Sequence, residues 1–361
     1  MKAAAAKFLL VVASVVLTLA AMEIGLRFLG PPPASAPVIP DPVFDHVHLR
    51  DFTFKAYSPD DQFQPFTAYW DSQGLVADPE KKLASDPARP PREVALVGDS
   101  FVESSQAPYA ASFAGRLNAG AAPAVHFSNW GVSSYSPLIY ILLWRTRILA
   151  THPAHVFLLL YENDVNDDTV YAGKAEFGPD GFPVRVAGAP EPAFLAPLRR
   201  SAVFRTFRYA LLKIRAGIHA KNDPAVANAG EYQEVSPDIS PLTARMILEL
   251  KREIEADGAR LTVLAVPSRR ADILGDPADG FRPFASKAAA WCRGNGVDYL
   301  DLEGPFLDAR KKNGPGKLFF KKDIHFTPAG HEIVAGVIRK SAPEYFSSGA
   351  PKESASPGGT K

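Results

Sequence analysis

Cysteine is almost absent from this sequence of 361 residues, which contains only Cys292. A single cysteine excludes an intramolecular disulfide, a cysteine-based zinc site and a Cys-x-x-Cys redox motif. It also excludes a lipoprotein, because the one cysteine lies far from the N-terminal apolar segment. A surplus of charge is lacking too: the formal net charge is +1, and the sequence has no long basic stripe of the kind that binds nucleic acid. We therefore expect no nucleic-acid partner.

Two further motifs are missing, namely a phosphate-binding loop and a Gly-x-Ser-x-Gly elbow. Residues 164–176 are superficially similar to a calcium loop. However, Thr169 stands in place of the required glycine, and Glu176 closes the stretch one residue late. We interpret these residues as a solvated loop, and we expect neither a metal nor an organic cofactor. The 47% of hydrophobic residues is enough for a sizeable buried core.

The N-terminus contains the longest apolar segment. Residues 8–22 are uncharged and apolar, and apolar residues continue to Leu29 past Glu23 and Arg27. This length lies between a signal-peptide core and the roughly 20 residues of a membrane-spanning helix. We predict a single-pass inner-membrane anchor over residues 1–29, with its leading lysines in the cytoplasm and the rest of the chain periplasmic or otherwise extracytoplasmic. Secretion after signal cleavage at Ala20 stays open as an alternative.

Short apolar runs alternate with segments of helical spacing from residue 93 to residue 345. The predicted strands cover 94–97, 125–128, 156–161, 261–266 and 297–302, and the predicted helices cover 137–150, 241–257, 284–293 and a segment that begins at Pro328. This alternation predicts an α/β domain with a parallel sheet and helices on both faces. Such sheets bind ligands beyond the carboxyl ends of their strands.

Four other segments flank or interrupt this pattern. Residues 30–42 are a proline-rich linker, and residues 43–92 read as an irregular N-terminal lead-in with short strands. Residues 168–240 form an insertion that we interpret as a lid or as a surface for an envelope protein partner. Residues 346–361 are a polar tail that we expect to be disordered. The basic residues of the insertion are Arg199, Arg200, Arg205, Arg208, Lys213 and Arg215.

Candidate functional residues follow the predicted strands. Ser100 follows the first strand, Gly131 the second and Asn163 the third, whereas Asp323 and His325 come just before the last helix. A serine needs a base to become a nucleophile, and His325 can be that base while Asp323 orients its ring. The oxyanion of an acyl-transfer intermediate needs hydrogen-bond donors. The backbone N–H groups of Ser100 and Gly131 and the side-chain amide of Asn163 are candidates.

The blocks that contain these residues resemble those of the SGNH hydrolase superfamily, also called GDSL-like esterases and lipases. The resemblance covers about residues 92–342, and its first block is similar to Val97-Gly98-Asp99-Ser100-Phe101. It implies a flavodoxin-like three-layer α/β/α sandwich. It also implies a catalytic set of Ser100, His325 and Asp323, and an oxyanion hole of Ser100, Gly131 and Asn163.

The sequence departs from the family pattern in two blocks. Tyr161 stands where the third block commonly has glycine. The last block is Asp-x-His rather than Asp-x-x-His, with Lys322 three residues before the histidine. Asp-x-His also occurs in membrane-anchored and periplasmic branches of the superfamily, including alginate O-acetylation proteins, and the N-terminal segment is in keeping with such a branch.

Three functions are open at this point. The first is an extracytoplasmic serine esterase that removes acyl groups, above all acetyl, from a carbohydrate or lipid. The second is an O-acetyltransferase that uses the same site to modify a cell-envelope polysaccharide. The third is a non-catalytic binding or scaffold protein on the same fold, against which the presence of all five site residues argues.

Overall fold

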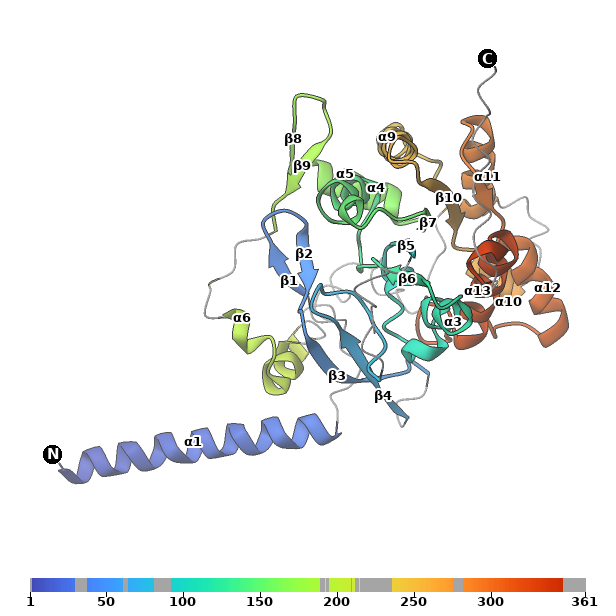
Figure 1. The fold of residues 1–361 in the computed structure, drawn as a ribbon. Coiled ribbons are helices and arrows are strands. Elements are labelled where there is room, and N and C mark those ends of the chain that lie inside the picture. The colour runs from blue at the N-terminus through green and yellow to red at the C-terminus, as the bar shows by residue number, and fades with distance from the viewer. Residues whose placement is uncertain are drawn as a thin grey trace, which may run out of the picture.

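A parallel sheet forms the centre of the protein in a computed structural model (Figure 1). Its five strands are β5 (Arg92–Gly98), β6 (Val125–Asn129), β7 (His155–Leu160), β10 (Arg260–Ala265) and β11 (Tyr299–Leu300). They lie side by side in the order β6-β5-β7-β10-β11. Counted along the chain, this is the doubly wound, flavodoxin-like order 2-1-3-4-5.

Alternate residues of each central strand point to opposite faces of the sheet, and helices cover both faces. Ala95 and Val97 of β5 face a core that includes α4 (Pro137–Leu143), α9 (Pro241–Ala256) and α11 (Phe284–Gly294). Val94 and Leu96 face a second core that includes α3 (Phe113–Gly120), α12 (Glu303–Asn313) and α13 (Pro328–Ser341). These layers confirm the predicted α/β/α sandwich.

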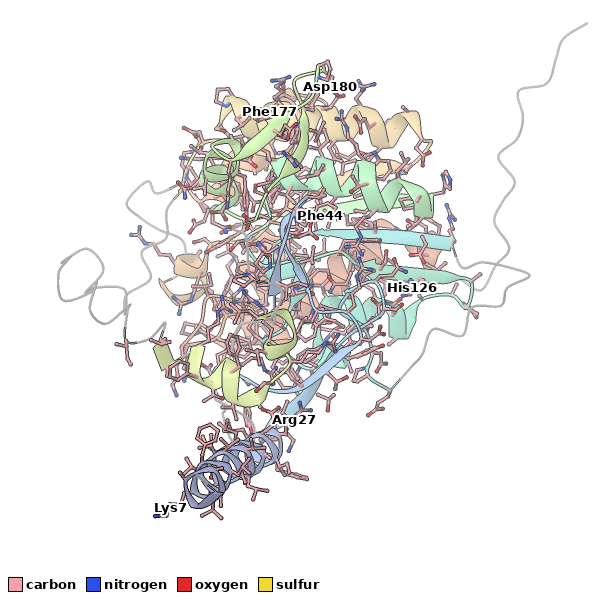
Figure 2. All side chains as sticks on the ribbon, turned by 90° about the vertical axis from the view of Figure 1, so that its left-hand side faces the viewer. Lys7, Arg27, Phe44, His126, Phe177 and Asp180 are labelled. Carbon is pink, nitrogen blue, oxygen red and sulfur yellow. The ribbon has the colours of Figure 1, made fainter. Side chains whose placement is uncertain are left out.

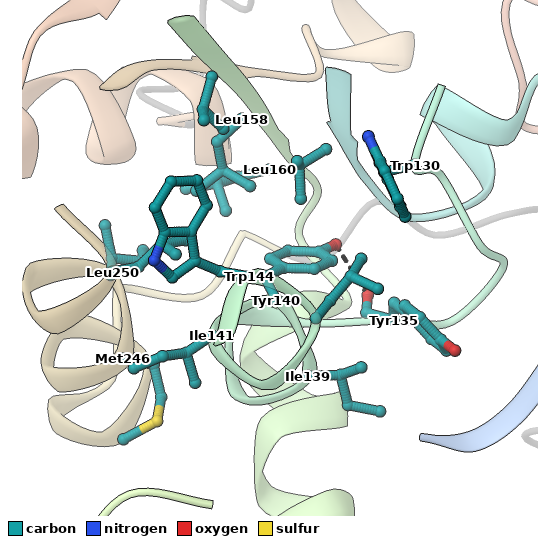
Figure 3. Packing of buried hydrophobic residues seen from close by; sticks show 14 of the residues in the cluster. Trp130, Tyr135, Ile139, Tyr140, Ile141, Trp144, Leu158, Leu160, Met246 and Leu250 are labelled. Atoms are coloured by element: carbon teal, nitrogen blue, oxygen red, sulfur yellow. Dashed lines mark hydrogen bonds between the residues drawn. The ribbon is translucent and has the colours of Figure 1, made fainter. Parts of the chain in front are cut away.

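The first core is dominated by large side chains from α4 and the residues just after it. Figure 3 shows Tyr140 and Trp144 between Leu160 of β7 and the α9 residues Met246 and Leu250. The Tyr140 hydroxyl donates a hydrogen bond of 2.9 Å to the Tyr135 carbonyl, so this polar group is satisfied within the core. The packing fixes β7, and with it the loop after β7, against two helices.

The sheet strands and the four predicted helices are confirmed, with changes at their ends. The helix predicted for 137–150 ends as α4 at Leu143 and continues as a π turn (Trp144–Ile148) and a 3-10 turn (Leu149–Thr151). The strand predicted for 297–302 is reduced to the two residues of β11. Helices α3 and α12 were not predicted.

Before the sheet, the chain forms two antiparallel hairpins. They are β1 (Val38–Asp41) with β2 (Asp45–His48), and β3 (Phe52–Tyr57) with β4 (Pro65–Trp70). β1 thus uses residues that the sequence assigns to the proline-rich linker. A third hairpin, β8 (Ala175–Phe177) with β9 (Pro183–Val186), belongs to the insertion and bridges to the first hairpin between Phe44 and Val186.

A long apolar helix, α1 (Lys2–Leu29), precedes these elements (Figure 1). Its stretch Ala4–Phe28 is long and apolar enough to cross a membrane and is not buried against the rest of the protein. The structure describes residues 2–29, 38–60, 64–80, 92–188, 192, 195–208, 210, 211, 214, 236–274 and 282–346. Lys213 and Arg215 of the insertion and the predicted tail beyond residue 346 lie outside the described residues.

Candidate active site

Ser100 begins the short helix α2 (Ser100–Glu103) directly after β5. The Asp99 carboxylate caps this helix by accepting a hydrogen bond of 2.9 Å from the Phe101 N–H. A side chain at Gly98 would collide with Val102 and with the Leu159 carbonyl, so glycine is needed where the strand turns into the helix. The turn therefore holds Ser100 at the carboxyl end of a central strand.

His325 and Asp323 come to Ser100 from the loop before α13. The Ser100 hydroxyl lies 2.8 Å from His325 Nε2, and the other ring nitrogen, Nδ1, contacts Asp323 Oδ1. The same Asp323 oxygen accepts the His325 backbone N–H at 2.9 Å. The Phe101 ring packs beside the imidazole with its centroid 4.9 Å away. The structure thus brings the three predicted catalytic residues into one continuous hydrogen-bonded chain.

The Asp323 carboxylate is partly buried, with 30% of its side chain exposed. Burial alone would raise its pKa, but hydrogen bonds from the His325 ring and from the His325 and Ile324 N–H groups outweigh it and lower the pKa below the ordinary value. Asp323 therefore stays ionised and can stabilise a proton taken up by His325.

The three predicted oxyanion donors differ in the hydrogen bonds that they already make within the protein. The Ser100 N–H belongs to the first turn of α2, and no acceptor for it is recorded among the described residues. The Asn163 amide donates one hydrogen bond of 2.8 Å to Asp167, which leaves its second N–H. The Gly131 N–H donates to Asn129 Oδ1 at 2.9 Å, so it would have to share or release this bond to contact an oxyanion.

Gly131 also has a packing role. A Cβ at this position would lie 2.2 Å from the Glu103 nitrogen and 2.5 Å from the Val102 carbonyl carbon. The glycine therefore lets the loop after β6 pack directly on the backbone of α2. The close approach is to the helix that begins with Ser100.

Sequence reasoning missed a buried ion pair one turn beyond Ser100. Glu103 lies 3.1 Å from His48 Nε2, and both side chains are essentially inaccessible. The same Glu103 oxygen accepts the Ser133 N–H at 2.8 Å and the Ser133 hydroxyl at 2.7 Å. Burial works to raise the pKa of Glu103, but the His48 charge and the bonds from His48 and Ser133 lower it to about 2. No local sequence signal marks this contact, because His48 comes from β2 and lies far from Glu103 in the sequence.

Residues 164–176 were interpreted as a solvated loop, and this interpretation is wrong. They begin with helix α5 (Asp164–Ala172), in which Asp164 and Asp168 are buried one turn apart. Asp168 accepts hydrogen bonds from the Leu138 N–H at 2.8 Å and the Thr243 hydroxyl at 2.7 Å. These bonds replace water and allow the carboxylate to be buried.

Buried carboxyl groups extend from α5 to the residue next to Ser100. Burial raises the pKa of Asp99 to about 7, against the opposing effects of the Phe101 N–H and the His325 charge. Burial, with the nearby Asp99 and Asp168 charges, raises the pKa of Asp164 well above its ordinary value. In the part of the chain that the structure describes, no group of three or more histidine, cysteine, aspartate or glutamate residues could hold a metal ion.

A small cavity is lined by residues that directly precede or follow the candidate catalytic and oxyanion residues in the sequence. Its volume is about 10 Å³, which is room for about one water molecule. Its wall is mostly apolar and aromatic and includes residues next to Ser100, Asn163 and His325. The lining residues are Phe101, Tyr161, Glu162, Val266, Pro267, Arg269, Phe284, Phe319 and Ile324.

Comparison with known proteins agrees with the resemblance found in the sequence. Residues 229–356 match the family described as SGNH hydrolase-like domain, acetyltransferase AlgX. This part of the chain includes Asp323 and His325 and confirms the resemblance to SGNH hydrolases over its length. No curated protein matches the chain in sequence.

Three solved structures match the chain at low sequence identity. An acetylxylan esterase from Geobacillus stearothermophilus is 12% identical, with 70% of this chain and 94% of that chain covered and a TM-score of 0.40. An α/β hydrolase enzyme from the metagenome of Lake Arreo is 14% identical, with 71% and 96% covered and a TM-score of 0.41. A member of the lipolytic G-D-S-L family from Veillonella parvula is 13% identical, with 70% and 97% covered and a TM-score of 0.37.

Proposed function

We propose that this protein is an extracytoplasmic serine acyl-transfer enzyme that acts on O-acyl groups, above all acetyl, of a carbohydrate or lipid. The observation that carries the proposal is the hydrogen-bonded chain from the Ser100 hydroxyl through His325 to Asp323. Its position also supports the proposal. Ser100 follows β5 and Asn163 follows β7, the neighbouring strands at which the chain order of the sheet reverses, where ligands of such sheets bind.

The geometry supports a two-step mechanism. His325 Nε2 takes the Ser100 proton as the oxygen attacks the acyl carbon, and Asp323 stabilises the resulting imidazolium. The Ser100 N–H and the second Asn163 N–H stabilise the oxyanion, with Gly131 joining if its bond to Asn129 is shared. The leaving alcohol takes the proton from His325. A water molecule or a second hydroxyl then repeats the attack on the acyl-serine.

The cavity whose wall includes Phe101 and Ile324, the chain neighbours of Ser100 and His325, is the pocket that we assign to the acyl group. Its volume of about 10 Å³ accommodates one water-sized group, such as a methyl. Aromatic side chains form much of the wall, and Phe101 and Phe319 are buried in the second core of the sandwich, so widening the space would disturb packed residues. We therefore favour acetyl over the acyl chains of lipids.

Hydrolysis and transfer share this acyl-enzyme and differ only in the acceptor. The matched family, described by an acetyltransferase, supports O-acetyl transfer to a cell-envelope polysaccharide as the second candidate. Labelled acetyl from an activated ester decides between them: a transferase delivers label to added glycan faster than to water, whereas an esterase releases it as acetate.

The proposed location is the outer face of the membrane that α1 spans. α1 is long and apolar enough to cross a membrane. Lys2 lies just before its apolar stretch, and Lys7 lies near the start of that stretch. Near the other end, the Phe28 carbonyl accepts a hydrogen bond of 2.9 Å from the Lys55 ammonium group of β3. Such contacts with the folded domain favour a retained anchor over a cleaved signal.

Turnover of p-nitrophenyl acetate by the full-length protein in detergent tests the proposal. We expect Ser100→Ala and His325→Ala each to lower kcat by at least about a thousandfold, because triad members act as a unit. Ser105→Ala, a partly exposed serine just after α2, is the matched control and retains activity. The longer p-nitrophenyl octanoate is turned over more slowly. Equal activity of Ser100→Ala and wild type would refute the mechanism and favour a scaffold protein.

A further inference from the structure

A helical segment of the insertion exposes an apolar stripe. Residues 202–208, 210, 211 and 214 are helical. Phe207, Leu211 and Ile214 follow one another at spacings of four and three residues, which places them on one face. Their exposed fractions are 63%, 41% and 59%. Three large apolar side chains in a row on a helix surface require a covering partner.

The start of this segment is attached to the end of α1. The Glu23 carboxylate of α1 accepts hydrogen bonds from the Ser201 hydroxyl at 2.7 Å, the Ala202 N–H at 2.9 Å and the Val203 N–H at 3.1 Å. It thereby caps the N-terminus of the helical segment. Arg27, one turn further along α1, pairs with Glu23 at 2.8 Å.

These contacts fix the depth of the segment relative to a membrane. A charged pair on an unburied helix is costly in hydrocarbon, so Glu23 and Arg27 belong at the level of the lipid headgroups. Because Glu23 bonds directly to residues 201–203, the helical segment begins at that same level. An amphipathic helix at this depth buries its apolar face in the boundary between headgroups and acyl chains.

Exposed basic side chains lie at the junction between α1 and the start of the helical segment and continue along the segment to Arg208. Lys55, Arg200 and Arg208 are exposed, and Arg27 is exposed at the end of α1. Arg205 instead lies over the rings of Phe52 and Phe54, which holds the segment against β3. Exposed cations beside an apolar stripe match the surface of a bilayer that contains anionic phospholipid.

We propose that the described residues of the helical segment, 202–208, 210, 211 and 214, lie in the headgroup region of the membrane that α1 spans, as a second contact of the domain with anionic lipid. This rests on the proposed retention of α1 and not on the chemistry at Ser100. Two contacts orient the domain where one helix would leave it free to swing. Figure 2 shows Phe177 and Asp180 of the β8–β9 hairpin at the end of the molecule opposite to Lys7 and Arg27, so the hairpin is a reference position away from α1 and the helical segment.

Site-specific fluorescence on the full-length protein tests the proposal. Cys292 is buried, so a single introduced cysteine can be labelled selectively with an environment-sensitive fluorophore. Phe207→Cys, Leu211→Cys and Ile214→Cys carry the label on the stripe. Phe177→Cys, with a native side chain 41% exposed on β8, is the matched control. The probe membrane is a phosphatidylcholine vesicle that contains phosphatidylglycerol, with and without quenching groups on the acyl chains.

We expect acyl-chain quenchers to remove the emission at positions 207, 211 and 214, and aqueous iodide to have little effect there. At position 177 we expect the reverse. Labels on the stripe that behave like the one at 177 in vesicles would overturn the proposal. Labels that are shielded only in native membranes, and not in vesicles, would also overturn it in favour of a protein partner. Unchanged esterase activity in the labelled proteins shows that they are folded, and its absence in every form including wild type would count against the proposed function alone.

Discussion

Glu103 shows at the scale of one residue how the nucleophile is positioned. Its carboxylate joins α2 to Ser133 of the loop after β6 and to His48 of the first hairpin. Removing it takes away the buried group that lies 3.1 Å from His48 Nε2 and the acceptor of the Ser133 N–H, and it releases the loop that packs on α2 through Gly131. Glu103 does not touch the reacting atoms, so we regard it as a positioning residue.

Glu103→Ala is expected to lower the free energy of unfolding by about 3 kcal/mol, because it breaks a buried pair. It should also lower kcat for p-nitrophenyl acetate more than it changes KM, since the defect lies in the geometry around Ser100. Glu103→Gln retains an oxygen that can accept from Ser133, and it should recover part of kcat. Chemical denaturation and steady-state kinetics measure both effects. Glu332→Ala, on the exposed side of α13, is the control.

At the scale of secondary-structure elements, the Asp168 carboxylate connects three helices by hydrogen bonds. From α5 it accepts from Leu138 near the start of α4 and from Thr243 in the first turn of α9. Burial raises its pKa from 3.8 to about 6, against the hydrogen bonds that it accepts. The folded state therefore holds this proton at a pH where the unfolded chain has released it.

The sign of the pH effect follows from proton counts. Between about pH 4 and about pH 6 the folded state binds more protons than the unfolded state, so Asp168 makes stability fall as pH rises. Asp168→Asn keeps both partners, since its amide can donate to the Thr243 hydroxyl, and it removes this titration. Its stability relative to wild type should rise by about 3 kcal/mol from below pH 4 to above pH 6.

Denaturation curves of Asp168→Asn and wild type at both pH values measure this change. Asp308→Asn, an exposed aspartate on α12, is the control and should show no such pH dependence. A relative stability of Asp168→Asn that is the same at both pH values would mean that the pKa of Asp168 is the same in the folded and unfolded states.

The elements that the sequence predicts well are those whose burial is nearly complete. The residues from Val94 to Val97 are all apolar, so the sequence predicts a strand that is covered on both faces, and all four are buried. The prediction from the sequence is wrong at α5, where Asp164 and Asp168 were interpreted as part of a solvated loop. The partners of Asp168, Leu138 of α4 and Thr243 of α9, are distant in sequence, so no local pattern reveals that this carboxylate is satisfied inside the protein.

The candidate site follows the same rule. Ser100, Asp323 and His325 are recognisable because each lies in a short block with its own spacing. The ion pair of Glu103 and His48 is not, because it joins the lead-in hairpin to α2 across the fold. Interpreting residues 43–92 as an irregular lead-in hid the fact that β2 supplies a buried partner beside the site.

At the scale of the whole molecule, distant parts of the chain must come together for the site to exist. Ser100 and His325 are 225 residues apart in sequence and are joined by one hydrogen bond. The strand order places the ends of β5 and β7 side by side, and the loop before α13 closes over them. The proposed activity is therefore a property of the complete sandwich. The anchor α1 and the helical segment of the insertion would hold that sandwich in one orientation at the membrane.

The most direct test of the central claim is covalent labelling of the full-length protein with a fluorophosphonate, followed by intact-mass measurement and peptide mapping. An activated serine beside a histidine base attacks phosphorus as it would attack an acyl carbon. The account predicts one label per chain, located on Ser100, with none on Ser100→Ala and far slower labelling of His325→Ala. A wild-type protein that stays unlabelled, or that carries its label on another residue, would contradict it.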